Sequence, residues 1–251
     1  MYSIDITVFI LGLIIGSFLN VVIYRLPENK SIIWPGSHCT NCQTNLKIFD
    51  LIPVLSFIFT KGRCRYCDTK VSYQYPAVEL LTALLFLISY WRYSLSIEFL
   101  IYSGLIALLI VCTFIDLKYQ IIPNKITYPG IIIFFIISFF FNHITIKSSL
   151  LGIVLSGGFL LVIAIVSRGG MGIGDVKLAA MVGSVIGVKY TIIGIFIGSL
   201  IGSIISLILI GFNIKDRKDR IPFGPFIAIG TVVMIFYGNV IINWYLDLLA
   251  F

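Results

Sequence analysis

Two aspartates stand at the edges of long apolar runs in this sequence. Asp116 ends the apolar run 97–115, and Asp175 precedes the apolar run 176–188. A carboxylate beside a bilayer is costly, so an aspartate at the border of a membrane span indicates a functional site. Two carboxylates that lie close together share one proton, so that one takes a proton from water while the other donates a hydrogen bond to a carbonyl oxygen. The two aspartates are therefore candidates for a pair that activates water.

The residues around Asp175 leave two interpretations open. Glycines dominate the stretch 169–174, and Gly172 and Gly174 allow the close backbone approach that an entering extended peptide needs. This favours a substrate-binding turn. Asp is also a preferred N-cap residue, so Asp175 could simply begin a helix. Lys177 does not face Asp175 on a helix, but it could reach the opposite aspartate or a lipid headgroup.

Glu79 is a third carboxylate near an apolar run, just inside the run 77–91. It could support the site or the helix bundle. It could equally be a first-turn carboxylate that the helix dipole stabilises, since Pro76 stands near the expected helix start. The sequence leaves both interpretations open.

Four of the five cysteines form two C-x2-C pairs, separated by 21 residues, at Cys39, Cys42, Cys64 and Cys67. Two such pairs typically close one tetrahedral zinc site, and four thiolates leave no open position for water, so the zinc would be structural. Reduced spectator thiols and redox use are the alternatives. His38 could compete as a ligand, although a solvated histidine is favoured. Cys112 lies in an apolar run and is interpreted as a small buried hydrophobic residue.

The composition is that of a polytopic membrane protein. Hydrophobic residues make up 59% of the 251 residues, and the mean hydropathy is +1.06. Soluble domains are about 45–50% apolar. Because a transmembrane helix needs about 20 apolar residues, we predict an all-α fold of about eight spans. They are placed at 5–24, 77–91, 97–115, 126–141, 149–166, 176–188, 191–212 and 223–246.

The basic residues predict how these spans are oriented. With the N-terminus outside, four alternate loops and their borders hold 15 of the 18 Lys and Arg residues, at 25–76, 116–126, 167–177 and 213–222. Such loops are cytoplasmic, which places the cysteines and both aspartates on that side. Anionic membrane lipid then accounts for the net charge of +7, and no nucleic acid is expected as a partner. The predicted domains are a first transmembrane helix at 1–24, a cytoplasmic loop domain at 25–76 and a seven-helix membrane domain at 77–251.

These motifs together resemble those of the bacterial type IV prepilin peptidases, a family of GxGD-type membrane aspartyl proteases. The cysteine pairs match the cytoplasmic loop of that family, Asp116 matches its first catalytic aspartate, and 172–178 matches its G-x-G-D motif with Asp175. The resemblance covers nearly the whole chain. Further matching motifs stand at 16–27, 50–56, 75–80 and 221–226.

The resemblance implies a peptidase of the bacterial cytoplasmic membrane with Asp116 and Asp175 as its catalytic residues. It would cut the short basic leader from a prepilin or pseudopilin, between glycine and a hydrophobic residue, while the substrate's hydrophobic N-terminal helix lies in the bilayer. Many members also N-methylate the new N-terminus with S-adenosylmethionine. In the family, the N-terminal motif and the cysteine loop have been linked to this second activity.

One departure from the family and two alternative functions complete this prediction. Relatives often carry an acidic residue where this chain has Asn124, so one negative charge near the leader-binding region is missing. The first alternative is a peptidase that lacks methyltransferase activity. The second, of a different class, is a transporter or assembly scaffold whose aspartates move ions or bind helices.

Overall fold

The computed structural model of the chain is helical and contains two compact units, Met1–Val111 and Cys112–Phe251. It contains no strand among the residues that it describes, only two isolated β-bridges. The predicted all-α fold is therefore confirmed for this part of the chain. The described residues are 2–141, 143–167, 170–216 and 219–249.

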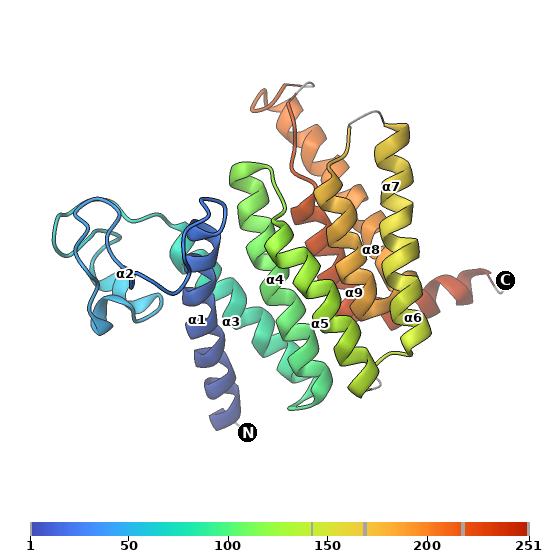
Figure 1. Cartoon of the computed structure of the whole chain (residues 1–251), viewed down its shortest axis with the longest axis horizontal. Helices are drawn as coiled ribbons and strands as arrows, with labels where there is room; N and C mark the ends of the chain where they lie inside the picture. Colours follow the sequence, from blue (N-terminus) through green and yellow to red (C-terminus); the bar gives the residue numbers. More distant parts are fainter. Residues whose placement is uncertain (1, 142, 168–169, 217–218, 250–251) are drawn as a thin grey trace. The chain divides into compact units, whose positions relative to one another are not determined.

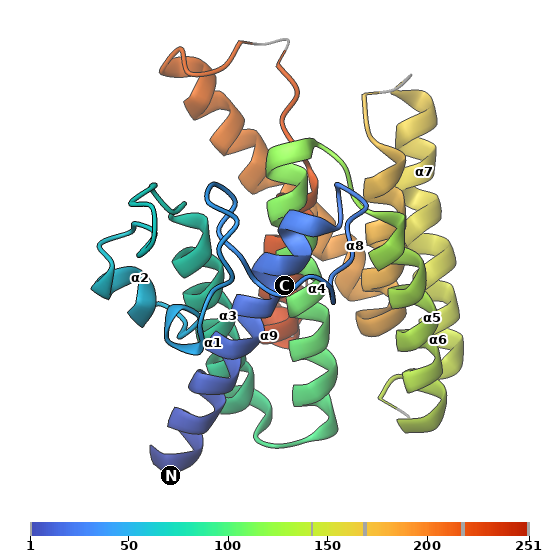
Figure 2. The same ribbon diagram turned by 60° about the vertical axis from the view of Figure 1, so that its left-hand side comes forward.

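The first unit is organised around a close pair of helices, α1 (Tyr2–Arg25) and α3 (Gln74–Tyr93), which lie side by side in Figures 1 and 2. Glycine permits this approach, because a Cβ atom at Gly16 would lie 2.7 Å from the Cα of Glu79. The first part of α4 (Ile97–Tyr119) contributes Phe99 to the apolar cluster of this unit. The motif at 16–27 is thus where α1 meets α3.

The segment between α1 and α3 has little regular structure. It contains a single 3-10 turn, η1 (Ile48–Asp50), and a five-residue helix, α2 (Leu55–Phe59). Neither element is long enough to form a core, so such a segment needs a staple. The two cysteine pairs lie on either side of these elements.

The second unit is a bundle of α5, a continuous α6–η2–α7 run, α8 and α9, which Figure 1 shows next to one another. Where the second of these meets α8, a Cβ atom at Gly152 would collide with the carbonyl group of Gly183. The helix has π geometry at this contact. Single π turns of this kind occur within longer α-helices. The bounds are α5 Asn124–Phe141, α6 Ile146–Leu151, η2 Gly152–Ser156, α7 Gly157–Val166, α8 Ile173–Gly211 and α9 Gly224–Leu249.

A sharp break divides α8 at Gly187, which has φ 74° and ψ 173°. An L-residue with a side chain rarely adopts this conformation, so glycine is required at the break. The hydroxyl of Thr191 donates to the carbonyl of Gly187 at 2.7 Å. The 39 residues of α8 therefore run in two directions.

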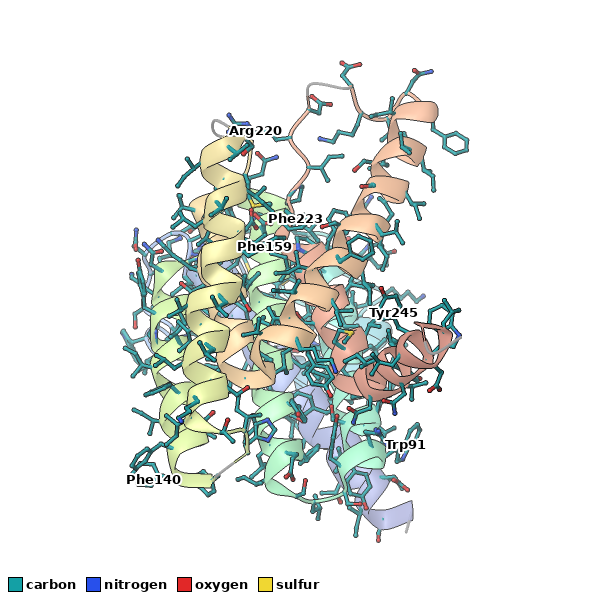
Figure 3. The ribbon with its side chains drawn as sticks, turned by 90° about the vertical axis from the view of Figure 1, so that its right-hand side faces the viewer. Trp91, Phe140, Phe159, Arg220, Phe223 and Tyr245 are labelled. Atoms are coloured by element: carbon teal, nitrogen blue, oxygen red, sulfur yellow. The ribbon has the colours of Figure 1, made fainter. Side chains whose placement is uncertain are left out.

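The second part of α8 packs on α9 through small residues. Gly194 and Gly198 are four residues apart, and a Cβ atom at Gly194 would lie 3.1 Å from the carbonyl oxygen of Gly230. Stripes of small residues at this spacing let helix backbones touch in membranes. Phe226 packs against Gly198 and Gly202 near the start of α9. The C-terminal part of α9, which carries Tyr245, projects beyond the other helices of this unit (Figure 3).

Six helices among the described residues are long and apolar enough to cross a membrane, so the count of eight spans is not confirmed. Two differences account for this. The helix α3 occupies the predicted span 77–91 but is not among the six, and α8 counts as one helix although it is broken at Gly187. The proposed division at residues 24 and 76 stays a prediction. Gly169, in the predicted glycine-rich turn, lies outside the described residues.

Candidate active site

Asp116 lies in the last turn of α4 and is held by the first residue of α9. Its side chain is buried, with 5% of the residue exposed, and the backbone N–H of Gly224 donates to its Oδ2 at 2.9 Å. The first N–H groups of a helix have no partner within the helix and readily bind a carboxylate. The C-terminal motif at 221–226 therefore provides a hydrogen-bond donor to this aspartate.

Asp175 lies in the first turn of α8 and is 7% exposed. Gly172 occupies the N-cap position of this helix, and the N–H of Asp175 donates to the Gly172 carbonyl at 3.1 Å. The interpretation of Asp175 as the N-cap residue is therefore wrong, because Asp175 is the third residue of the helix and its carboxylate is hydrogen-bonded back to the backbone of the N-cap residue Gly172. A Cβ atom at position 172 would lie 3.5 Å from Oδ2 of Asp175, so glycine keeps the space beside the carboxylate narrow but open.

Ile122, in the loop between α4 and α5, connects the surroundings of the two aspartates. A Cβ atom at Gly174 would lie 2.9 Å from the Cβ of Ile122, and one at Gly224 would lie 3.3 Å from its Cδ1. Gly174 directly precedes Asp175, and Gly224 binds Asp116. The two carboxyl groups are close enough for Asp116 to act electrostatically on Asp175. The two buried carboxylates of this unit therefore lie near the same residue, Ile122, and the charge of one affects the other.

Lys177 is directed to α5. Its Nζ donates to Oδ1 of Asn124 at 2.8 Å and lies 5.0 Å from the ring centroid of Tyr128. Asn124, which stands where the resembling peptidases often have an acidic residue, is thus the hydrogen-bond partner of this lysine. An amide oxygen at that position keeps the hydrogen bond but carries no charge, so the positive charge of Lys177 is left without a paired carboxylate there.

Sequence reasoning did not assign roles to Gly224 and Ile122. The Gly-Pro dipeptide at the start of an apolar run does indicate a helix N-terminus, and the stripe Gly194, Gly198 and Gly202 indicates a close helix contact. Which helix that stripe contacts, and which carboxylate the N-terminus then meets, depends on the tertiary packing.

We expect replacement of Gly224 by alanine to lower the peptidase activity predicted from the motifs by about 10²-fold, since a displacement of about 1 Å at a catalytic group has such an effect and Asp116 is the predicted one. The new methyl group would lie 2.8 Å from Oδ2 of Asp116 and would displace the carboxylate from the N–H that holds it. The matched control is Gly158→Ala, because a Cβ atom at that helix position meets nothing within 4 Å. Initial cleavage rates of the two purified variants are the measurement. Equal rates would contradict the assigned role of Gly224.

Glu79 belongs to the first unit and joins three of its segments. It is 6% exposed, it accepts the N–H of Val54 at 2.8 Å, and it is hydrogen-bonded to the side chain of Ser17 on α1. Val54 has φ 61°, which is unusual for a β-branched residue. Glu79 therefore connects the helix pair to the segment between α1 and α3 that carries the cysteine pairs, and a role for it in the site stays a prediction.

The four cysteines meet, as the spacing predicts. Their sulfur atoms all lie within 4.8 Å of one another, and Sγ of Cys39 is 3.8 Å from Sγ of Cys67. Four sulfurs at 2.3 Å from one tetrahedral ion would be about 3.8 Å apart. The arrangement therefore fits a zinc site, formed by Cys39, Cys42, Cys64 and Cys67.

The two cysteine pairs have the same backbone conformation. The N–H of Cys39 donates to the Thr44 carbonyl, and the N–H of Cys64 donates to the Thr69 carbonyl. Each pair is closed by a β-bridge and followed by a residue with positive φ. Contacts with Thr69, followed by a hydrogen bond from Asn41, lower the pKa of the Cys67 thiol to about 6. At Cys67 that favours the thiolate, which is the form that binds zinc, whereas burial contributes to raising the pKa of the Cys64 thiol to about 11.

His38 and Cys112, the histidine and the remaining cysteine considered in the sequence, lie outside the cluster of four sulfur atoms. His38 contacts the carbonyl oxygen of Gly36 through its Nδ1 atom at 2.9 Å and is not among the four grouped ligands. Cys112 is fully buried and free, as predicted for a small apolar residue. Neither residue changes the proposed ligand set.

The family model for the bacterial peptidase A24 N-terminal domain matches residues 10–93, and the model for the type IV leader peptidase family matches residues 103–207. A prepilin leader peptidase/N-methyltransferase of Bacillus subtilis is 37% identical over 246 residues, which cover 96% of this chain and 97% of the relative. The chain belongs to the type IV leader peptidase family.

Further relatives carry the same description. The one from Legionella pneumophila is 34% identical and covers 94% of this chain and 92% of its own. The one from Pseudomonas putida is 30% identical and covers 96% and 93%. No solved structure matches the chain. The family and the apolar helices together establish a membrane protein, and the resemblance drawn from the motifs is confirmed.

Proposed function

We propose that the protein is a membrane-embedded aspartic endopeptidase that removes the leader of type IV prepilins or pseudopilins and N-methylates the new N-terminus. The observation that carries the peptidase activity is the pair Asp116 and Asp175, both buried within one unit, with Ile122 packed against Gly224 beside the first and Gly174 beside the second. The relatives named as prepilin leader peptidases/N-methyltransferases support the substrate class and the second activity.

The proposed mechanism uses the two carboxyl groups and one water molecule. The ionised carboxylate takes a proton from water, and the oxygen attacks the carbonyl carbon of the scissile bond. The protonated partner donates to the carbonyl oxygen, where negative charge develops. When the tetrahedral intermediate collapses, the C–N bond breaks and the carboxyl group that took the proton from water passes it to the nitrogen, while the partner carboxylate takes a proton back from a hydroxyl of the intermediate. The products are a carboxylic acid, which ionises in water, and a free amine. The N–H of Gly224 fixes the orientation of Asp116 throughout.

The glycines around Asp175 support entry of an extended peptide. Gly172 and Gly174 precede the carboxylate and pack closely against Asp175 and Ile122, respectively. Irregular backbone at membrane depth is tolerated where it lines a wet cavity. We place the scissile Gly–hydrophobic bond at this turn, with the substrate's apolar helix in the bilayer.

The orientation belongs to the same proposal. The cysteine segment and both aspartates face the cytoplasm, and the N-terminus lies on the outer side of the inner membrane, as the distribution of basic residues favours. The basic leader would then meet the enzyme on the side where it is synthesised.

Two cofactors are assigned different roles. Zinc on the four cysteines would be structural, since a fourth sulfur leaves no position for water. S-adenosylmethionine would supply a methyl group on a positively charged sulfur. No residue is assigned to this donor, and the peptidase mechanism does not use it.

Incubation of the purified enzyme with a prepilin, with and without S-adenosylmethionine, tests both activities in one measurement. Mass analysis of the mature N-terminus is expected to show loss of the leader in both samples and one added methyl group only with the donor. Leader removal without methylation would support a peptidase without methyltransferase activity. An intact prepilin in both samples would contradict the proposal and favour a transporter or scaffold.

A further inference from the structure

A buried guanidinium lies at the end of the first membrane helix. Arg25 is the last residue of α1, which is a candidate span, and it is 7% exposed. Its Nη1 and Nη2 atoms donate to the carbonyls of Ser31 at 3.1 Å and Gly36 at 3.0 Å. The ion pairs found among the described residues do not include Arg25. A buried positive charge without a counter-charge is costly, so an anion is expected nearby.

These two hydrogen bonds close a short loop against the end of α1, and the loop has an apolar tip. The hydroxyl oxygen of Ser31 accepts the N–H groups of Ile33 at 3.3 Å and Trp34 at 3.2 Å, which fixes the turn. Ile33 is 85% exposed and Trp34 is 78% exposed. Tryptophan is favoured at the membrane–water interface, where one side of its ring is apolar and the other is wet.

A cavity of about 370 Å³ lies beneath this loop, and Arg25, Lys30, Trp34 and His38 are among the residues that line it. Cavities that bind small ligands have volumes of about 300–1,000 Å³. Lys30 forms an ion pair with Glu28 at 2.5 Å, so these two charges offset each other. The guanidinium of Arg25 is therefore the charge in this lining that remains to be balanced.

We propose that this cavity binds the phosphate headgroup of an anionic phospholipid, while Ile33 and Trp34 insert into the interfacial layer beside it. A lipid accounts for both observations at once. Its phosphate balances the buried charge, and its glycerol and acyl region covers the apolar tip, which a soluble anion would leave in water. The position at the end of a span places the cavity at headgroup depth.

Such a site goes beyond the proposed peptidase function and does not depend on it. The cysteine segment begins directly after Arg25, and its first loop is bonded to that side chain. A lipid bound at this position would hold the start of the segment at the membrane surface. One basic residue near an anionic surface contributes about 1 kcal/mol, which corresponds to about fivefold local enrichment of anionic lipid.

A single-tryptophan protein can test this site. The changes Trp91→Phe and Trp244→Phe leave Trp34 as the one tryptophan of the chain. The full-length protein is placed in bilayers of phosphatidylglycerol and phosphatidylcholine at equal mole fraction, with bromine on the acyl chains of either lipid. The expected result is stronger quenching of Trp34 when phosphatidylglycerol carries the bromine, by a ratio approaching the fivefold enrichment.

Two arginine variants separate the site from general electrostatics. Arg25→Gln is expected to abolish the preference for phosphatidylglycerol, whereas Arg92→Gln, an exposed arginine of α3, is expected to retain it. If Arg25→Gln fails to fold, the exchange of the bromine label in the otherwise unchanged single-tryptophan protein still decides the question.

Several results would overturn the inference. Equal quenching by both labels would mean that the anionic headgroup is not selected. Quenching by acrylamide but not by bromine would place Trp34 in water, and protection from both would place it against protein. A response of Trp34 emission in lipid-free detergent to inorganic phosphate or to S-adenosylmethionine would assign the cavity to a soluble ligand instead.

Discussion

Asparagine at position 116 or 175 is expected to lower prepilin cleavage by about 10³-fold or more, because each change removes a carboxyl group that moves a proton. Asparagine has nearly the same shape as aspartate, and its side-chain oxygen can still accept the N–H of Gly224. The packing around Ile122 is therefore retained, and the loss would reflect chemistry. Each variant is assayed as purified protein, with cleavage followed by the mass of the substrate.

The matched control for these variants is Asp247→Asn, which changes an exposed aspartate of α9 in the same unit. Its cleavage rate is expected to stay within about twofold of the unchanged protein, as is usual for exposed positions. All three variants should insert into the membrane normally. If either asparagine variant at 116 or 175 turned over substrate at the unchanged rate, the two-carboxylate mechanism would be excluded.

Loss of one cysteine from each pair is expected to remove the metal and loosen residues 25–76. With Cys39→Ser and Cys64→Ser, bound zinc should fall from about one ion per chain to nearly none, since two thiolates cannot close a tetrahedral site. The cysteine segment contains only η1 and α2, so it has little core to replace the lost staple. Zinc is measured by elemental analysis, and loosening by hydrogen exchange across the segment.

Cys112→Ser is the control for this pair of changes, because it removes a thiol that lies outside the cluster. It is expected to retain zinc. The initial rate of peptide cleavage should also resist a chelator added with the substrate, because the proposed mechanism uses no metal. Purified unchanged protein without zinc would contradict the assignment of the cysteines as its ligands.

Two predictions about the region of α8 differ from the structure: its division into two spans and the N-cap role of Asp175. Two separate spans are predicted at 176–188 and 191–212, and the helix is indeed broken near their border, at Gly187. The two parts nevertheless follow each other without a loop and together form the broken helix α8. The capping interpretation of Asp175 failed for a related reason. A glycine at position 172 can end the preceding turn without any side chain, which leaves the aspartate inside the first turn.

From the sequence alone we could predict the membrane class, the family, the meeting of the four cysteines and the candidate aspartates. These follow from composition, from the spacing of the C-x2-C pairs and from local motifs, all of which act over short distances along the chain. The tertiary structure decided which groups surround each carboxylate. Gly224 reaches Asp116 across more than 100 residues because the glycines of α8 allow α9 to approach closely. Such a contact depends on how two distant helices pack, and no local pattern specifies their relative position.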